Sequence, residues 1–169
     1  GVMNTDNMSI VGETIDFGPC AFIDEFRPNK VFSSIDTQGR YARNQQPNMA
    51  QWNLVKFAET LLPLFSANQE EAVALAQAEV DRFPDVFNAL FWSGFAAKLG
   101  LAASNAEQQE LIQSLFKLMT TAEADFTLFF DRLTRHAAGE EESPLLAMYN
   151  GEAGFADWLR QWRTLREGA

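Results

Sequence analysis

Several residue types are scarce in this sequence of 169 residues, and each scarcity excludes a class of protein. Cys20 is the single cysteine, which excludes an internal disulfide and fits a reducing compartment. Lysine and arginine number 13 against 23 aspartates and glutamates, and the net charge of −10 disfavours a nucleic-acid or anionic-membrane surface. No apolar run is long enough to span a bilayer, and the first residues lack the basic-then-apolar pattern of a signal peptide.

Large apolar side chains, by contrast, are abundant. Hydrophobic residues make up 47% of the sequence, which has 15 phenylalanines and 4 tryptophans. A chain of this length and composition can bury a core, so we expect one folded structural domain and no extended disorder. From Pro47 onward the apolar residues recur at intervals of three and four, which predicts helices. Capping-box patterns that open at Ser66, Ser104 and Thr120 predict helix starts, and Gly100 predicts a helix end.

The first twenty residues carry most of the chemistry. Gly12 and Glu13 separate two β-prone runs, 8–11 and 14–17, and this spacing predicts a tight β-hairpin. In such a hairpin Asn7 lies diagonal to Asp16, about 7 Å apart at the backbone. Two oxygen-bearing side chains that converge from this distance can share one hard cation. Asp6 adds a second carboxylate beside the hairpin.

Four stretches of the sequence carry a family resemblance. They are Gly-Val-Met-Asn-Thr-Asp-Asn-Met-Ser-Ile (1–10), Thr-Ile-Asp-Phe-Gly-Pro (14–19), Asp-Thr-Gln-Gly-Arg-Tyr (36–41), and Gln-Pro followed by Trp-Asn-Leu (46–54). Together they resemble the selenoprotein O family, in which a kinase-like fold transfers AMP from ATP to protein hydroxyls. The resemblance implies a mainly α fold: a short β-hairpin followed by about six helices, similar to the C-terminal lobe of a protein kinase. It covers about a third of the sequence, and the helical remainder adds no specific motif.

The resemblance also implies roles for individual residues. Asp6 is implied as the proton acceptor, and Asn7 and Asp16 as ligands of Mg²⁺, with Mn²⁺ as the alternative metal. Asp16 is implied to reach the phosphates of ATP through the metal. The implied partners are ATP and proteins that offer Ser, Thr or Tyr hydroxyls, and the implied location is the bacterial cytoplasm.

Two other functions stay open at this point. Kinase-like phosphotransferases usually carry an aspartate five residues before the metal-binding asparagine, and here Val2 holds that position, which weakens an ordinary phosphotransferase. The second alternative is a non-catalytic helical interaction domain, which the broad aromatic faces support. The position of a transferred label distinguishes the first alternative, and the absence of metal dependence distinguishes the second.

The resemblance divides the sequence into a metal-binding and activation-loop-like part, 1–46, and the helical part of the lobe, 47–169, within one structural domain. In the first part, Asp36 and Arg40 either contact the active site or form an ion pair that ties down a surface loop, and we favour the surface loop. We expect the sequence to be a fragment without its N-terminal lobe and C-terminal tail, inactive by itself. The apolar stripe over 158–165 is then expected to be partly exposed and to invite self-association.

Overall fold

The structure is a computed structural model that describes residues 1–13, 20–102, 105–149 and 154–167. The chain forms two compact units. Unit 1 comprises Gly1–Ala21 and Pro28–Asn88, and unit 2 comprises Phe22–Arg27 and Ala89–Ala169. The chain passes between the units at three points, and the last of them falls inside one helix, α3 (Phe83–Lys98).

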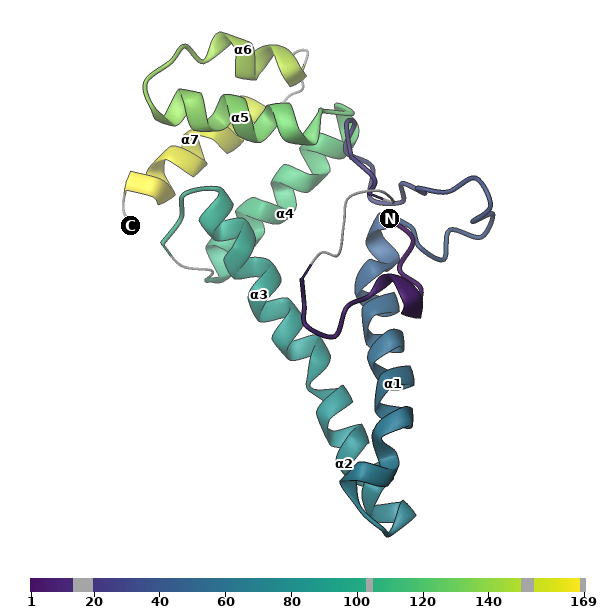
Figure 1. The fold of residues 1–169 in the computed structure, drawn as a ribbon. Helices are drawn as coiled ribbons and strands as arrows, with labels where there is room; N and C mark the ends of the chain where they lie inside the picture. Colours follow the sequence, from purple (N-terminus) through teal and green to yellow (C-terminus); the bar gives the residue numbers. More distant parts are fainter. Residues whose placement is uncertain (14–19, 103–104, 150–153, 168–169) are drawn as a thin grey trace. The chain divides into compact units, whose positions relative to one another are not determined.

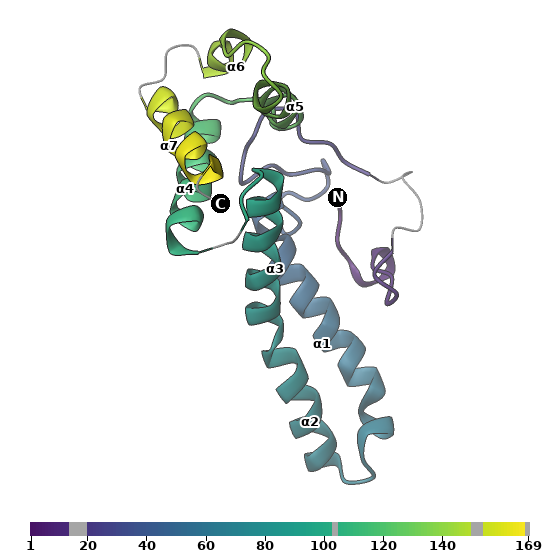
Figure 2. The ribbon, with the colours of Figure 1, turned by 90° about the vertical axis from the view of Figure 1, so that its left-hand side faces the viewer.

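Unit 1 is built on a pair of antiparallel helices. α1 (Gln46–Phe65) and α2 (Gln69–Asp81) lie side by side in both ribbon views (Figures 1 and 2). Asn68 caps α2, because its side-chain oxygen accepts the backbone N–H groups of Glu70 and Glu71. The predicted capping residue, Ser66, instead bonds to the carboxylate of Glu71 and to the backbone N–H of Asn68.

The apolar residues that unit 1 buries completely are small or flexible, and many of its larger ones are exposed. The buried residues are Ala42, Met49, Ala72 and Ala76. The exposed large apolar residues are Ile10, Val11, Val31, Ile35, Trp52, Leu54, Phe57, Leu64, Phe65, Val73, Leu75 and Val86. Unit 1 therefore gains little stability from a core of its own.

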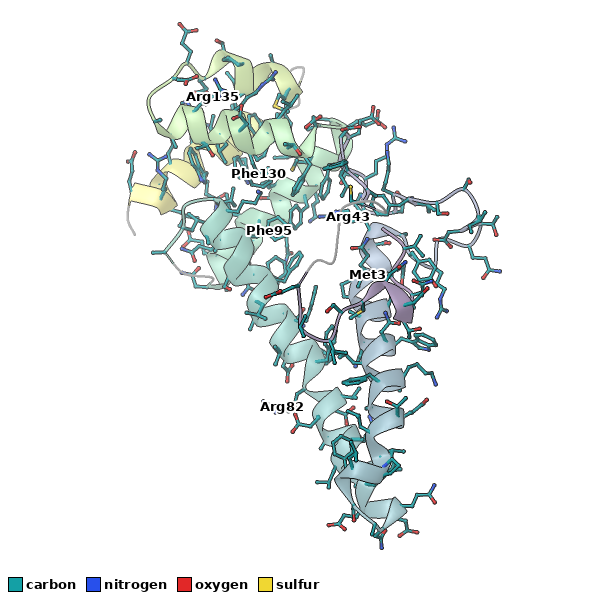
Figure 3. All side chains as sticks on the ribbon, in the orientation of Figure 1. Met3, Arg43, Arg82, Phe95, Phe130 and Arg135 are labelled. Carbon is teal, nitrogen blue, oxygen red and sulfur yellow. The ribbon has the colours of Figure 1, made fainter. Side chains whose placement is uncertain are left out.

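Unit 2 contains the hydrophobic core, which is rich in aromatic rings. It combines the later part of α3 with α4 (Ala106–Thr121), α5 (Phe126–Ala137), α6 (Ser143–Leu146) and α7 (Phe155–Glu167). Phe130 is buried in this core (Figure 3). Phe95 is half-buried and packs against the core. α4 and α7 pack together, and the indole N–H of Trp158 in α7 donates to the carbonyl of Leu111 in α4 at 2.9 Å.

The apolar stripe over 158–165, which was expected to be partly exposed, is buried at three of its four apolar positions and half-buried at Leu165. Trp158, Leu159 and Trp162 are 3%, 1% and 2% exposed. The indole N–H of Trp162 donates to the carbonyl of Leu99 at 2.8 Å. Both tryptophans face the same side because they are four residues apart on one helix, and that side finds its packing partners within unit 2.

The short segment Phe22–Arg27 joins unit 2 through backbone hydrogen bonds. The N–H of Phe26 donates to the carbonyl of Ala124 at 2.9 Å, and the N–H of Phe126 donates to the carbonyl of Asp24 at 2.7 Å. The Phe26 ring is 1% exposed and stacks between the rings of Phe116 and Phe126. This segment is therefore pinned along the start of α5.

The mainly α prediction is confirmed, but the predicted β-hairpin is wrong. Its first arm, 8–11, contains no strand; a turn occupies 9–12, in which the N–H of Gly12 donates to the carbonyl of Ser9 at 3.2 Å. The Ser9 hydroxyl also accepts the N–H of Val11, a local bond that competes with strand pairing. Ile10, which a hairpin would place on its apolar face, is 78% exposed. The second arm, 14–17, lies outside the described residues.

None of the described helices is both long enough and apolar enough to cross a bilayer.

Candidate active site

The candidate site begins with one tight turn near the start of unit 1. Thr5–Asn7 form a single 3₁₀ turn, η1, in which the N–H of Asn7 donates to the carbonyl of Asn4 at 3.1 Å. Asp6 lies in the middle of this turn, and its side chain is exposed. A carboxylate in this position is accessible to an incoming hydroxyl group, as the role of proton acceptor requires.

The side chain of Asn7 is held in one orientation by the same turn. Its amide nitrogen Nδ2 donates to the carbonyl oxygen of Val2 at 2.9 Å. Because the nitrogen is the only donor of an amide side chain, this bond leaves the oxygen Oδ1 as the atom that can bind a cation. Oxygen is the ligand that Mg²⁺ prefers, so the observed orientation of Asn7 fits the predicted metal role.

Asp16, the other predicted metal ligand, lies outside the described residues, as does the whole Asp-Phe-Gly stretch. The predicted pairing of Asn7 with Asp16 therefore stays a prediction. Within the described ranges no three His, Cys, Asp or Glu side chains gather as a metal site, and this leaves open a site made of Asn7 with Asp16.

A pocket of about 560 Å³ lies between this segment and α1, within unit 1. Its walls are mostly apolar, and the residues that line it are Thr5, Met8, Ser9, Ile10, Gly12, Asn53, Leu54, Lys56, Phe57 and Thr60. Two of the lining residues, Thr5 and Met8, are the sequence neighbours of Asp6 and Asn7. The site thus combines a polar turn with an adjoining apolar cavity.

Asn53 is the residue in this region that the sequence reasoning missed. It is 5% exposed, its Nδ2 donates to the carbonyl of Met3 at 3.0 Å, and the same nitrogen lies 2.8 Å from the sulfur of Met8. The signal in the sequence was its spacing: it stands four residues after Met49 and four before Phe57 on an apolar helix face. A polar residue that is buried in such an apolar stripe is expected to have a specific hydrogen-bond partner.

The loop that contains Asp36 and Arg40 is held by contacts within unit 1. The Asp36 carboxylate accepts the backbone N–H groups of Arg40 and Tyr41 at 2.8 and 2.9 Å. The guanidinium carbon of Arg40 lies 4.9 Å from the centre of the Trp52 ring, within the range of a cation–π interaction. Both residues therefore tie down the loop, although Asp36 does so through the backbone and not through the expected ion pair.

His136 lies far from this turn in the sequence, in the last turn of α5. Its ring nitrogens contact the carbonyl of Glu140 and the guanidinium of Arg163, and Arg163 also forms an ion pair with Glu142. These contacts account for the position of the His136 ring.

An exposed carboxylate beside an amide whose oxygen is free to bind a cation suits a metal-assisted group-transfer enzyme. Comparison with known proteins gives the family. The model of the protein adenylyltransferase SelO family matches residues 1–167, and the chain belongs to this family.

Curated relatives agree with this match. The chain is 53% identical over 163 residues to a protein nucleotidyltransferase YdiU of Agrobacterium fabrum, covering 96% of the chain and 33% of that protein. It is 51% identical over 170 residues to a protein of the same name from Mycolicibacterium paratuberculosis, covering 98% of the chain and 35% of that protein. It is 47% identical over 175 residues to the one from Shewanella denitrificans, again with 96% and 35% covered. The chain thus spans about a third of the length of these relatives.

Proposed function

We propose that the protein containing this chain transfers AMP from ATP to Ser, Thr or Tyr hydroxyls of other proteins. The observation that carries the proposal is the turn that presents Asp6 and fixes the Asn7 amide through Val2, in a chain of the adenylyltransferase family. The acceptors are proteins because the matching relatives are named protein nucleotidyltransferases.

Asp6 acts as the proton acceptor in this proposal. Its exposed carboxylate takes the proton from the incoming hydroxyl, which leaves the oxygen able to attack the innermost phosphorus of ATP. A new bond forms between that oxygen and the phosphorus, and the bond to the departing pyrophosphate breaks. Removal of such a base usually costs about 10²–10⁴-fold in rate.

Asn7 and Asp16 would hold the divalent metal, which is Mg²⁺ or Mn²⁺. A metal bound there supplies positive charge to the phosphate oxygens and offsets their growing negative charge. The contribution of this chain is the orientation of Asn7, because the bond from Nδ2 to Val2 keeps the oxygen as the metal-facing atom. Val2 also stands where kinase-like phosphotransferases carry their aspartate, which weakens an ordinary phosphotransferase.

The test uses the full-length protein with Mg²⁺, a generic protein acceptor, and ATP labelled on either the innermost or the outermost phosphate. We expect label from the innermost phosphate alone to reach protein, and we expect Asp16→Ala and Asp6→Asn to abolish or strongly reduce it. Asp85→Asn is the matched control, because Asp85 is an exposed aspartate in the first turn of α3.

Three outcomes contradict parts of the proposal. Label from the outermost phosphate makes the protein a kinase-like phosphotransferase. No label from either position favours the interaction domain. Transfer that survives in Asp16→Ala removes that residue from the metal site.

A further inference from the structure

The buried amide of Asn53 contacts the residues on either side of the turn that carries Asp6 and Asn7. Asn53 and Gln108 are the two buried amide side chains among the described residues, and Asn53 comes from α1, about fifty residues along the chain from the turn. Its nitrogen Nδ2 donates to the carbonyl oxygen of Met3 at 3.0 Å and lies 2.8 Å from the sulfur of Met8. Met3 lies against α1 in Figure 3.

The geometry of this contact is that of a clamp. An amide nitrogen carries two hydrogens, so it can donate to the Met3 carbonyl and to the Met8 sulfur at the same time. Met3 precedes Asp6 and Asn7, and Met8 follows them, so one side chain of α1 contacts the segment on both sides. It holds the backbone at Met3 directly and contacts Met8 through the side-chain sulfur, which is a weaker acceptor. Within the segment, the bonds from Asn7 to Val2 and to Asn4 close the turn on itself.

The oxygen of the same amide carries a cost that an apolar side chain at this position would not have. Its Oδ1 is buried and accepts no hydrogen bond from the described residues. An unsatisfied buried acceptor is costly, and an apolar side chain of similar size, such as leucine, would avoid that cost. What leucine lacks is the N–H donor that reaches the backbone carbonyl of Met3, just before the turn.

We propose that Asn53 is a positioning residue, which sets the places of the Asp6 carboxylate and the Asn7 oxygen through Met3 and Met8. The inference rests on the proposed function for its catalytic consequence, because only in that reaction do Asp6 and Asn7 take part. Small displacements of a reacting group are expensive in catalysis, so a loosened turn lowers the rate before it lowers the stability of the fold.

The first test compares Asn53→Leu with the wild type in the full-length protein. We expect kcat for AMP transfer to fall about tenfold or more and the Mg²⁺ concentration for half-maximal rate to rise, while the melting temperature stays the same or increases. Asn48→Leu is the matched control, because it makes the same change at an exposed position of α1 that does not contact the turn. A kcat within twofold of the wild type overturns the proposal.

A second variant keeps the proposal testable if Asn53→Leu does not fold. Asn53→Gln retains the amide on a stem that is longer by one methylene group, so we expect a kcat between those of the wild type and Asn53→Leu. A positioning role ranks kcat as wild type, glutamine, leucine, whatever the order of stability. A kcat that follows the melting temperature across the variants would show a merely structural role and overturn the proposal.

A third readout needs no activity, so it separates this inference from the proposed function. Hydrogen exchange of the peptide that covers residues 2–8 is measured without metal or nucleotide. We expect its backbone amides to exchange at least threefold faster in Asn53→Leu than in the wild type or Asn48→Leu, and equal rates would contradict the clamp. If the wild type transfers no AMP but the exchange rates differ, the proposed function fails and the clamp stands.

Discussion

Tyr149 offers the sharpest test of the core of unit 2. Its side chain is 1% exposed, its ring stacks on Phe155 with 3.7 Å between the ring centres, and it meets the Phe129 ring edge-on. Its hydroxyl is buried and has no hydrogen-bond partner among the described residues. Tyr149→Phe removes only that hydroxyl and keeps both ring contacts.

The expected magnitude of this change follows from two terms. Relief of an unsatisfied buried polar group is worth about 1–3 kcal/mol. The gap left by one oxygen atom, roughly 10–15 Å³, costs about 0.3 kcal/mol. We therefore expect Tyr149→Phe to raise the free energy of unfolding by about 0.7–2.7 kcal/mol, measured by urea unfolding.

The wild type and Tyr149→Phe should also differ in how their free energy of unfolding changes at alkaline pH. Burial raises the pKa of the Tyr149 hydroxyl above its ordinary value of 10.0. Above pH 10 the unfolded chain releases this proton while the folded chain keeps it, so the wild type loses stability as the pH rises. Tyr149→Phe lacks this loss, and its advantage should be about 1.4 kcal/mol larger at pH 11 than at pH 9.

Tryptophan fluorescence suits the measurement, because three of the four tryptophans belong to unit 2. Tyr41 is present in both proteins, so its contribution cancels in the comparison. If Tyr149→Phe is less stable than the wild type by 1 kcal/mol or more at pH 7, the hydroxyl has a partner and the reasoning fails. An advantage that does not change between pH 9 and pH 11 would contradict the raised pKa.

Three further predictions concern stability and are checked by urea or thermal unfolding. Trp162→Phe should lower the free energy of unfolding by about 2–4 kcal/mol, because it leaves a cavity and leaves the carbonyl of Leu99 without its hydrogen-bond donor. A decrease below 1 kcal/mol would contradict this. Asn105→Ala should lower the free energy of unfolding by about 1–2 kcal/mol, since Asn105 and Gln108 form the capping box of α4. An unchanged midpoint of unfolding would show that the capping box does not stabilise the fold. Arg27→Ala should cost less than about 1 kcal/mol although it breaks two ion pairs, because all three side chains are about half exposed; a larger loss would point to a role in packing.

Helix content and position were predictable because they depend on local periodicity. Gly100 ends α3 as expected: it has a φ of +69°, and the N–H of Leu101 donates to the carbonyl of Ala96 at 2.9 Å. The helix starts were less predictable, since several polar residues in a row can each serve as the cap. Asn68 caps α2 in place of Ser66, and Asp125 caps α5 in place of Thr120.

The hairpin shows the limit of local reasoning. Gly12 does adopt a positive φ, +72°, but the described turn spans 9–12 with Gly12 as its last residue and is not the predicted turn centred on Gly12 and Glu13. A strand, however, also needs a partner that accepts its backbone hydrogen bonds, and the local bonds of Ser9 satisfy this segment without one. The clamp by Asn53 was unpredictable for a related reason, because it joins residues about fifty positions apart and no local pattern records such a contact.

The contrast between the two cores has a thermal consequence. The heat capacity of unfolding grows with the apolar surface that unfolding exposes, so it measures how much of such surface each unit hides. Unit 2 hides its large aromatic rings, whereas unit 1 already presents many of its larger apolar side chains to solvent. The stability of unit 2 therefore curves steeply with temperature and that of unit 1 only shallowly, and the turn with Asp6 and Asn7 belongs to the unit with the shallow curve.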